Sequence, residues 1–219
     1  MEKIPYLKEL GITAVELMPV TEFDEIMMSS SGSSFHNAKQ EPTGYLNYWG
    51  YGPSYLYAVK TAYASRETMS AEGEFKTLVK ELHKAGIECI PEMYFTGKEL
   101  PGEILSVLRY WVEEYHVDGF HLTGFPDLSL AAEDPFLKRT KLFAENWNDV
   151  MNRRPKQGYV TPGDGAVSVE EKNLAEYNMQ FMEDMRRFLK GDEGMLSAFE
   201  LRNRRNPMEY AVINYMANT

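Results

Sequence analysis

The feature that most constrains the fold is a regular alternation of short apolar runs with segments of helical periodicity. Residues 72–85 place apolar side chains at helical spacing, with Ser70 as an N-cap and Gly86 at the end, and an apolar run follows at 87–95. Such alternation predicts an α/β fold of right-handed βαβ units with a largely parallel sheet. The expected helices are 2–10, 72–85, 104–115 and 181–190, and the expected strands are 12–18, 87–95, 117–122, 141–144 and 211–216.

Three features disturb this rhythm. Pro91 is costly in a central strand and weakens the prediction of a strand at 87–95, which we retain. Residues 24–47 and 149–173 are rich in turn-forming and polar residues and are expected to be long loops. In an α/β barrel, loops after strands build the functional face, although residues 24–47 could equally be a disordered insertion. Because no linker or composition break divides the chain, we expect a single domain over residues 1–219.

The charge balance excludes several classes of protein. Lys and Arg number 23 against 33 Asp and Glu, which gives a formal net charge of -10. This balance argues against nucleic-acid binding and against adsorption to an anionic membrane. No apolar run reaches the roughly 18 residues that a membrane-spanning helix needs, and the N-terminus has no apolar signal core. Cys89 is the single cysteine, so an internal disulfide is excluded, and a cytoplasmic location is expected.

The sequence gives no sign of a metal or cofactor site. His36, His83 and His116 have no metal-ligand spacing with carboxylates, and they are expected at surface or helix positions. Residues 163–165 read Gly-Asp-Gly, a turn signal that lacks the strand and helix context of a phosphate loop. We therefore expect neither a metal nor a cofactor.

Several segments, taken in order, resemble one enzyme family. The segment 6–20 reads YLKELGITAVELMPV, 47–53 reads NYWGYGP, 117–120 reads VDGF and 144–147 reads AENW. These segments resemble the α-amylase superfamily, glycoside hydrolase family 13, and within it the debranching group of isoamylases, pullulanases and glycogen debranching enzymes. The resemblance follows the family's order over nearly the whole chain, and this order makes it stronger than any one motif.

The resemblance implies a partial (β/α)8 barrel. The chain begins at what would be the first helix and ends at what would be the seventh strand. The first strand and the C-terminal units are therefore expected to be missing, which leaves open edges in the sheet. Open edges are hydrogen-bonding templates, so self-association through them is expected, ahead of closure into a smaller barrel or fraying of the ends.

The resemblance also implies that the catalytic nucleophile is lost. Retaining glycosidases use one carboxylate as nucleophile and another as general acid/base. The family's nucleophile is an aspartate at the end of the fourth strand, where this chain has Thr123, and an arginine two residues before it is His121 here. A threonine hydroxyl is a poor nucleophile without a strong adjacent base. Asp127 could substitute only through a looped backbone, and a turn-capping role is the simpler interpretation.

Other motif positions are partly kept. Glu145 falls at the family's acid/base position and is the candidate acid/base, the alternative being a glutamate that caps the next turn. In the first conserved region, Glu92 stands for an aspartate and Gly97 for a histidine that donates to the sugar. The fourth region would begin at Thr219, in place of a histidine.

Aromatic and amide side chains complete the set of candidate binding residues. In the family an aromatic residue of the 47–53 loop stacks on a sugar ring, so Tyr48, Trp49 and Tyr51 are candidates for glucan binding. The alternative is that they pack the loop onto the barrel. Glu92, His121 and Asn178 are the remaining candidate substrate-binding residues.

These residues lead to three hypotheses. The first is a debranching-type glycoside hydrolase relative that is catalytically inactive as this chain. The second is a non-catalytic module that binds α-glucan or has a regulatory role. The third is a truncated fragment without independent function. The replaced motif residues, such as Thr123 and Gly97, distinguish an active enzyme from a binding module or a fragment. They do not distinguish a binding module from a fragment.

Overall fold

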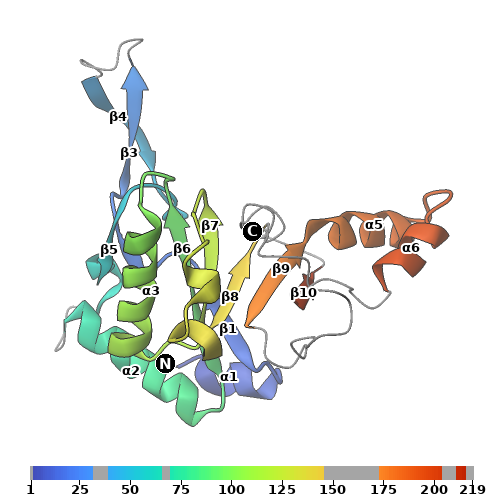
Figure 1. Ribbon diagram of the computed structural model, residues 1–219, viewed down its shortest axis with the longest axis horizontal. Coiled ribbons are helices and arrows are strands. Elements are labelled where there is room, and N and C mark those ends of the chain that lie inside the picture. The colour runs from blue at the N-terminus through green and yellow to red at the C-terminus, as the bar shows by residue number, and fades with distance from the viewer. Residues whose placement is uncertain (1, 32–38, 66–69, 146–172, 204–210, 216–219) are drawn as a thin grey trace, which may run out of the picture.

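A six-stranded parallel sheet forms the centre of the molecule, which we describe from a computed structural model at residues 2–31, 39–65, 70–145, 173–203 and 211–215 (Figure 1). The strands run in the order β1-β6-β7-β8-β9-β10, and every neighbouring pair is parallel. Their bounds are β1 Ala14–Leu17, β6 Glu88–Phe95, β7 Gly119–Gly124, β8 Lys141–Ala144, β9 Leu174–Asn178 and β10 Ala211–Asn214. The sheet curls as part of a barrel, which confirms the predicted fold class.

The expected strands and helices are present, with shifted ends. The α-helices are α1 Ile4–Glu9, α2 Ala71–Lys84, α3 Pro101–Tyr115, α5 Met179–Lys190 and α6 Leu196–Arg202, and short 3-10 helices lie at Thr61–Tyr63, Ala131–Glu133 and Leu137–Arg139. Helix α2 begins as predicted, because the Ser70 side chain accepts a hydrogen bond from the backbone N–H of Gly73. Helix α6 was not among the expected elements.

The core lies between the sheet and helices α2 and α3. Trp111 of α3 is fully buried, and its ring packs edge-on against Phe75 of α2 with 5.5 Å between centroids. Tyr115, one turn further along α3, contacts both rings. The indole N–H of Trp111 donates to the carbonyl of Leu56 at 2.7 Å, so the largest apolar side chain is also satisfied as a donor.

Residues 24–47 are more ordered than a loop. Strands β3 (Ile26–Ser31) and β4 (Lys39–Leu46) pair antiparallel and project from the body as a hairpin, at the top of Figure 1. The prediction of a long loop or disordered insertion was wrong here, because the two strands pair with each other from Ile26 opposite Leu46 to Ser31 opposite Lys39. A second antiparallel pair, β2 (Thr21–Phe23) and β5 (Ser54–Val59), lies at its base and was not predicted. The predicted loop 149–173 lies outside the described residues, apart from Asn173.

Strand β6 confirms the prediction of a strand at 87–95 and includes Pro91. The pairing of β6 with β1 ends at Pro91, and its pairing with β7 begins at the next residue, Glu92. Proline has no backbone N–H, and in β6 this missing donor lies at the point where pairing with β1 ends and pairing with β7 begins. The loss of hydrogen bonding in the sheet is therefore small.

Glycines hold both ends of β7 close to the neighbouring backbones. A Cβ atom on Gly119 would lie 2.6 Å from the carbonyl oxygen of Lys141, and one on Gly124 would lie 2.2 Å from the carbonyl oxygen of Phe95. Gly124 also has φ +80, a conformation that other residues rarely adopt. The position of β7 between β6 and β8 thus depends on the absence of side chains at these two residues.

The two ends of the described sheet, β1 and β10, do not pair with each other. The described strands therefore form an open sheet and not a smaller closed barrel. Self-association through these edges stays a prediction. No helix among the described residues has the length and apolar character to cross a membrane.

Candidate functional site

A cavity of about 730 Å³ lies where the carboxyl ends of the strands meet. Strand ends at this face carry the functional groups of α/β barrels. The cavity is lined by Glu16, Met18, Tyr51, Glu92, Tyr94, His121, Thr123, Gly124, Glu145, Tyr177, Met179 and Tyr215. Apart from Tyr51, which lies in the segment between β4 and β5, these residues come from the strands of the six-stranded sheet or from the residues that directly follow them, so the curl of the sheet assembles the site.

Five residues singled out from the sequence meet in this cavity, namely Tyr51, Glu92, His121, Thr123 and Glu145. Glu92 and His121 are register partners on adjacent strands, and Thr123 follows two residues later on the same face of β7. Thr123 is 7% exposed, and its hydroxyl makes no hydrogen bond of ordinary length and angle within the described part of the chain. The position matched to the family's nucleophile is therefore inside the site.

Three other candidates lie elsewhere. Tyr48 lines a different cavity, and Trp49 is 44% exposed with its ring edge-on to Tyr48. Asn178 caps helix α5, where its side chain accepts from the N–H of Phe181 at 3.0 Å and donates to Asn214. Asn178 therefore has a capping role, and Tyr51 is the one aromatic residue of the 47–53 loop that lines the cavity, while glucan binding by Tyr48 and Trp49 stays a prediction.

The simpler interpretation of Asp127 agrees with its position. Its carboxylate accepts a hydrogen bond from the N–H of Ser129 at 3.1 Å in the turn after β7. Asp127 is not among the residues that line the cavity. Thr219 and the end of the AENW segment lie outside the described residues.

A polar network links the strands across the cavity. His121 Nδ1 lies 2.6 Å from Glu16 Oε1, and the Tyr177 hydroxyl donates to the other oxygen of Glu16. The Tyr51 hydroxyl donates to Glu92 Oε2 at 3.2 Å. The rings of His121 and Tyr177 also contact each other, with centroids 4.4 Å apart. Each carboxylate is thus held by a tyrosine.

The two glutamates of the network have opposite pKa shifts. Burial raises the pKa of Glu92 above its usual value, and the nearby His121 offsets only part of this effect. Burial also acts to raise the pKa of Glu16, but the hydrogen bonds from His121 and Tyr177 outweigh it and lower that pKa. Burial, followed by the charge of Glu92, raises the pKa of Tyr51 to about 12, so its hydroxyl remains a donor at neutral pH.

Sequence reasoning missed Glu16, Tyr94, Tyr177 and Tyr215. Glu16 offered one signal, because it is the only charged residue in the apolar segment 12–18. The tyrosines offered none beyond the high tyrosine content of 14 residues. Their meeting depends on the curl of the sheet, since Glu16 and Tyr177 are 161 residues apart in the sequence.

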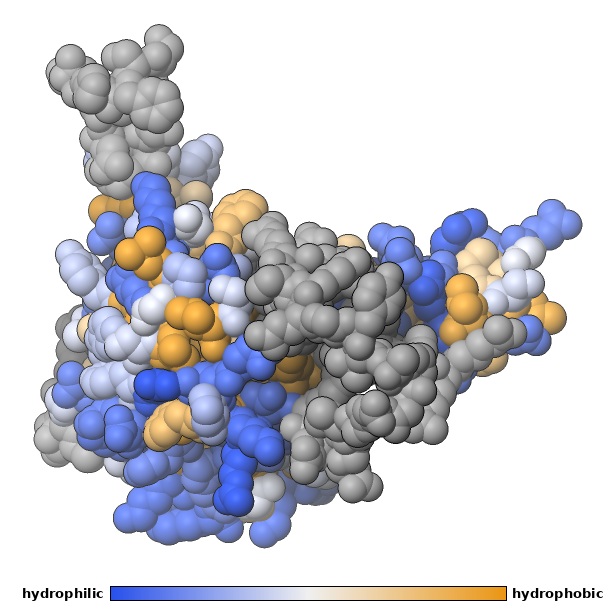
Figure 2. All heavy atoms as spheres, viewed as in Figure 1, coloured by the Kyte–Doolittle hydropathy of each residue, from blue (hydrophilic) through white to orange (hydrophobic). Residues whose placement is uncertain are grey.

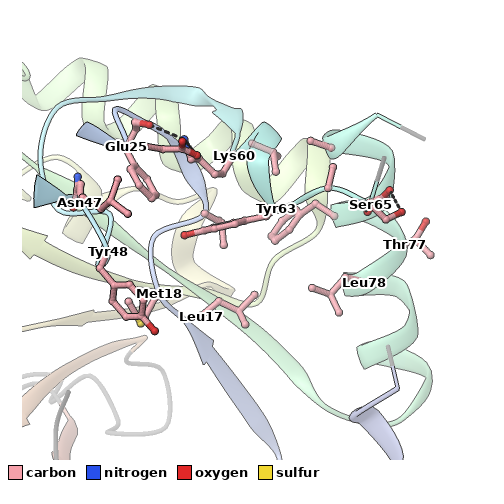
Figure 3. Close-up of a pocket in the computed structure, with 18 residues that line it drawn as sticks. Leu17, Met18, Glu25, Asn47, Tyr48, Lys60, Tyr63, Ser65, Thr77 and Leu78 are labelled. Carbon is pink, nitrogen blue, oxygen red and sulfur yellow. Dashed lines mark hydrogen bonds and ion pairs between the residues drawn. The ribbon is translucent and has the colours of Figure 1, made fainter. Parts of the chain in front are cut away.

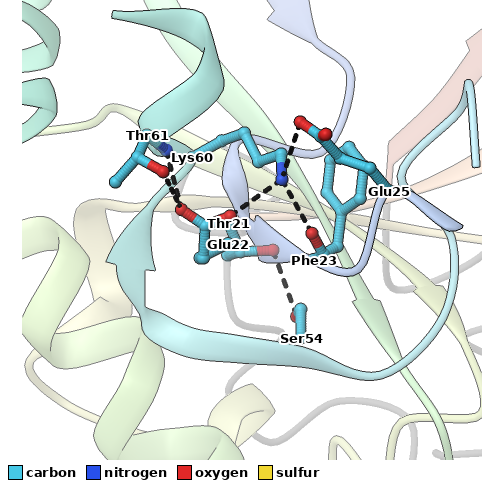
Figure 4. Close-up of polar contacts among 7 residues, drawn as sticks. All are labelled: Thr21, Glu22, Phe23, Glu25, Ser54, Lys60 and Thr61. Atoms are coloured by element: carbon cyan, nitrogen blue, oxygen red, sulfur yellow. Dashed lines mark hydrogen bonds and ion pairs between the residues drawn. The ribbon is translucent and has the colours of Figure 1, made fainter.

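A larger cavity of about 1060 Å³ lies between β1, β5 and α2 and is mainly apolar (Figure 3). The positively charged group in this cavity, the ammonium of Lys60, already has hydrogen-bond and ion-pair partners (Figure 4). The Lys60 ammonium group donates to Glu22 Oε1 at 2.8 Å and to the Phe23 carbonyl at 2.7 Å, and it lies 3.4 Å from Glu25 Oε1. We therefore assign the chemistry to the smaller cavity.

Comparison with known proteins identifies the lineage. No protein-family model matches the chain. Isoamylase 3 of Oryza sativa, a chloroplastic protein, is 30% identical over 92% of this chain, and a GlgX homologue of the Haemophilus influenzae glycogen operon is 30% identical over 90%. A glycogen debranching enzyme of Serratia proteamaculans is 29% identical over 97%. The chain spans 32%, 35% and 39% of these relatives, roughly a third of their length.

Solved structures show the same fold. A cyclomaltodextrinase matches 99% of the chain and 42% of its own, with a TM-score of 0.57 at 12% identity. A pullulanase from Paenibacillus barengoltzii, in complex with maltohexaose and α-cyclodextrin, matches 83% of this chain and 34% of its own, with a TM-score of 0.53 at 18% identity. The sheet is therefore part of an α-amylase-type barrel. The chain itself is a relative of the debranching-type enzymes of glycoside hydrolase family 13.

Proposed function

We propose that this chain binds the end of an α-glucan in the cavity at the strand ends and does not hydrolyse it. The observation that carries the proposal is Thr123, which occupies the position matched to the nucleophile, 7% exposed and facing the cavity. A hydroxyl there needs a strong base held against it to attack a sugar carbon. Loss of a nucleophile removes on the order of 10⁴-fold or more of an enzyme's rate.

A second replacement supports the absence of hydrolysis. Gly97 has φ +84, and a Cβ atom there would lie 3.0 Å from Cβ of Phe125. A histidine at this position would be strained whatever else was changed. Thr123→Asp alone is therefore not expected to create an active site.

The cavity retains features that suit a sugar. Four tyrosines line it, namely Tyr51, Tyr94, Tyr177 and Tyr215, and aromatic faces pack against the apolar faces of glucose rings. Glu92, His121 and Glu145 supply polar groups for hydroxyls. A pullulanase with the same fold is known in complex with maltohexaose, which supports an α-glucan as the ligand class.

Hydrolysis is tested by reducing-sugar release from glycogen, pullulan and maltoheptaose at high protein concentration. We expect no release above the buffer control. Turnover of about one per second would be at the low end for ordinary enzymes. If such turnover were measured in the wild-type chain and disappeared in Glu145→Gln, the proposal would be contradicted.

Binding is tested by titration with maltoheptaose followed by amide chemical shifts. We expect weak binding with a Kd of roughly 1 mM, or about 4 kcal/mol. Tyr51→Ala should abolish it, while Tyr55→Ala, which removes a 74% exposed tyrosine outside the cavity, should not. A response lost in Trp49→Ala but kept in Tyr51→Ala would place the ligand on the exposed loop instead. No response at tens of millimolar would favour a fragment without an independent role.

A further inference from the structure

Three side chains on three adjacent strands converge in the cavity. Glu16 comes from β1, Glu92 from β6 and His121 from β7. Glu92 is the register partner of His121, and it lies two residues beyond Ile90, the partner of Glu16, so all three point to the same face of the sheet. One potential ligand atom from each residue lies within 4.8 Å of the other two.

Buried polar atoms that lack ordinary hydrogen bonds face the same space. His121 Nε2 is shielded from solvent and has no hydrogen-bond partner among the described residues. The Thr123 hydroxyl, on a side chain that is more than nine-tenths buried, also makes no hydrogen bond of ordinary length and angle, although it interacts with the Glu92 carboxylate. Both residues line the cavity from the same face of β7. Buried polar groups in folded proteins are nearly always satisfied, so these two atoms indicate a ligand.

The charge of the cavity favours a cation. Its described lining includes three carboxylates, those of Glu16, Glu92 and Glu145, and neither lysine nor arginine. His121 is the one basic side chain among the described residues that line the cavity. A single imidazolium would leave the carboxylates in excess, whereas a divalent ion would balance two of them.

We propose that Glu16, Glu92 and His121 bind one divalent transition-metal ion, for which Zn²⁺ is the best fit. Zinc takes nitrogen and oxygen ligands at about 2.0–2.2 Å, which places the ligand atoms about 3–4 Å apart. Small side-chain rotations bring atoms that already lie within 4.8 Å of one another to such positions. Imidazole favours Zn²⁺ over Mg²⁺. Three protein ligands leave a coordination position open toward the cavity.

Two tyrosines are placed to orient the ligands. The Tyr177 hydroxyl donates to Glu16 Oε2, and the Tyr51 hydroxyl donates to Glu92 Oε2. Glu92 therefore keeps Oε1 for the metal while Oε2 is fixed by a hydrogen bond, whereas Glu16 Oε1, which lies 2.6 Å from His121 Nδ1, would exchange that contact for the metal. Partners of this kind set the orientation of metal ligands and affect affinity. This site goes beyond glucan binding and does not depend on it.

The site was not foreseen because its ligands are distant in the sequence. Glu16 and His121 are 105 residues apart, so no local spacing marks them. The sequence expectation of no metal rested on other histidines. Of these, His83 pairs with Asp118 at 2.8 Å.

The test is calorimetric titration of the chelator-treated 219-residue chain with Zn²⁺ and, in parallel, with Mg²⁺. We expect saturable binding of one equivalent of Zn²⁺ and none of Mg²⁺ at the same concentrations. His121→Asn and Glu92→Gln should each weaken binding by about tenfold or more, and Tyr177→Phe by about tenfold, since it removes only an orienting hydrogen bond. The control His83→Asn should bind as the wild type does.

A second measurement keeps the proposal testable if a variant fails to fold. In the wild-type chain, Zn²⁺ should shift the imidazole nitrogen resonances of His121 and leave those of His83 and His116 unchanged. Absence of saturable Zn²⁺ heat would overturn the proposal. Binding that survives both His121→Asn and Glu92→Gln, or shifts confined to the other histidines, would overturn it equally.

Discussion

The two parts of the molecule are held together in different ways. The packed part, residues 14–144 as described, contributes all but one residue of the main hydrophobic core, and Leu174 is the exception. The projecting part, formed by β9, β10, α5 and α6, extends to the right in Figure 1. There Leu189, Leu196 and Leu201 are 72%, 62% and 55% exposed, and apolar side chains are visible on this surface in Figure 2. The cavity is lined by residues of both parts.

The two helices of the projecting part contact each other directly. Arg202 of α6 donates to Asp184 of α5 at 2.7 Å, and the rings of Phe188 and Phe199 stack with centroids 4.5 Å apart. These contacts join α5 to α6 but not to the sheet. Because stability follows buried area, we expect the packed part to determine global unfolding and the projecting part to open more easily.

The largest effect should come from Trp111→Ala. This change removes a fully buried ring from the packed part and leaves a cavity, so the free energy of unfolding should fall by about 3–5 kcal/mol. Leu196→Ala in the projecting part should stay within about 0.5 kcal/mol, as exposed positions usually do. Urea unfolding followed by circular dichroism measures both. Similar losses for the two variants would show that the distinction between the parts is wrong.

A smaller effect is expected from Glu22→Gln. Lys60 is 3% exposed, and this change leaves its ammonium group with Glu25 as its remaining carboxylate partner. An under-compensated buried charge is destabilising, and partial exposure of Glu22 reduces the loss to about 2 kcal/mol. Glu81→Gln, which breaks the exposed pair with Lys84, should change the unfolding free energy by less than about 0.5 kcal/mol. Equal midpoints for both variants in thermal melts would contradict this.

The smallest effect compares two Asp–Arg pairs, one in each part. Arg109 donates to Asp134, which also accepts from the N–H groups of Phe136 and Leu137, and these contacts hold the pKa of Asp134 below its usual value. Asp134→Asn should cost about 1–2 kcal/mol at pH 7. Asp184→Asn, in the projecting part, should leave global unfolding nearly unchanged.

The pH dependence of the Asp134 effect has a definite sign. Because the folded-state pKa lies below the unfolded value of about 3.9, the charged carboxylate stabilises the fold above that pH. The contribution is lost as the pH falls through the folded pKa. The difference between wild type and Asp134→Asn should therefore shrink in unfolding curves recorded from pH 5 toward pH 2. A difference that grows on acidification would show that Asp134 does not act as a carboxylate.

The same division explains how far the sequence predicted the structure. Helix α2 was predicted closely, because its cap at Ser70 and its apolar spacing are local signals. The hairpin β3–β4 was missed because its strands are held by pairing with each other, which their largely polar sequence does not signal, and α6 was missed because it has only 7 residues. In the site, the family motifs found Glu92, His121 and Thr123. Glu16 and Tyr177 join them only through the curl of the sheet, which no local pattern records.

The glycines at the ends of β7 bear on how such a site changes over time. Gly119 and Gly124 fix the strand by backbone proximity, and neither supplies a functional group. The side chains at positions 121 and 123 between them can therefore change while the strand stays in place. Substitution at 121 or 123 alters which reactions or ligands the cavity supports, whereas substitution at 119 or 124 displaces the strand itself. A lineage can in this way lose one activity, and become open to another, without first losing its fold.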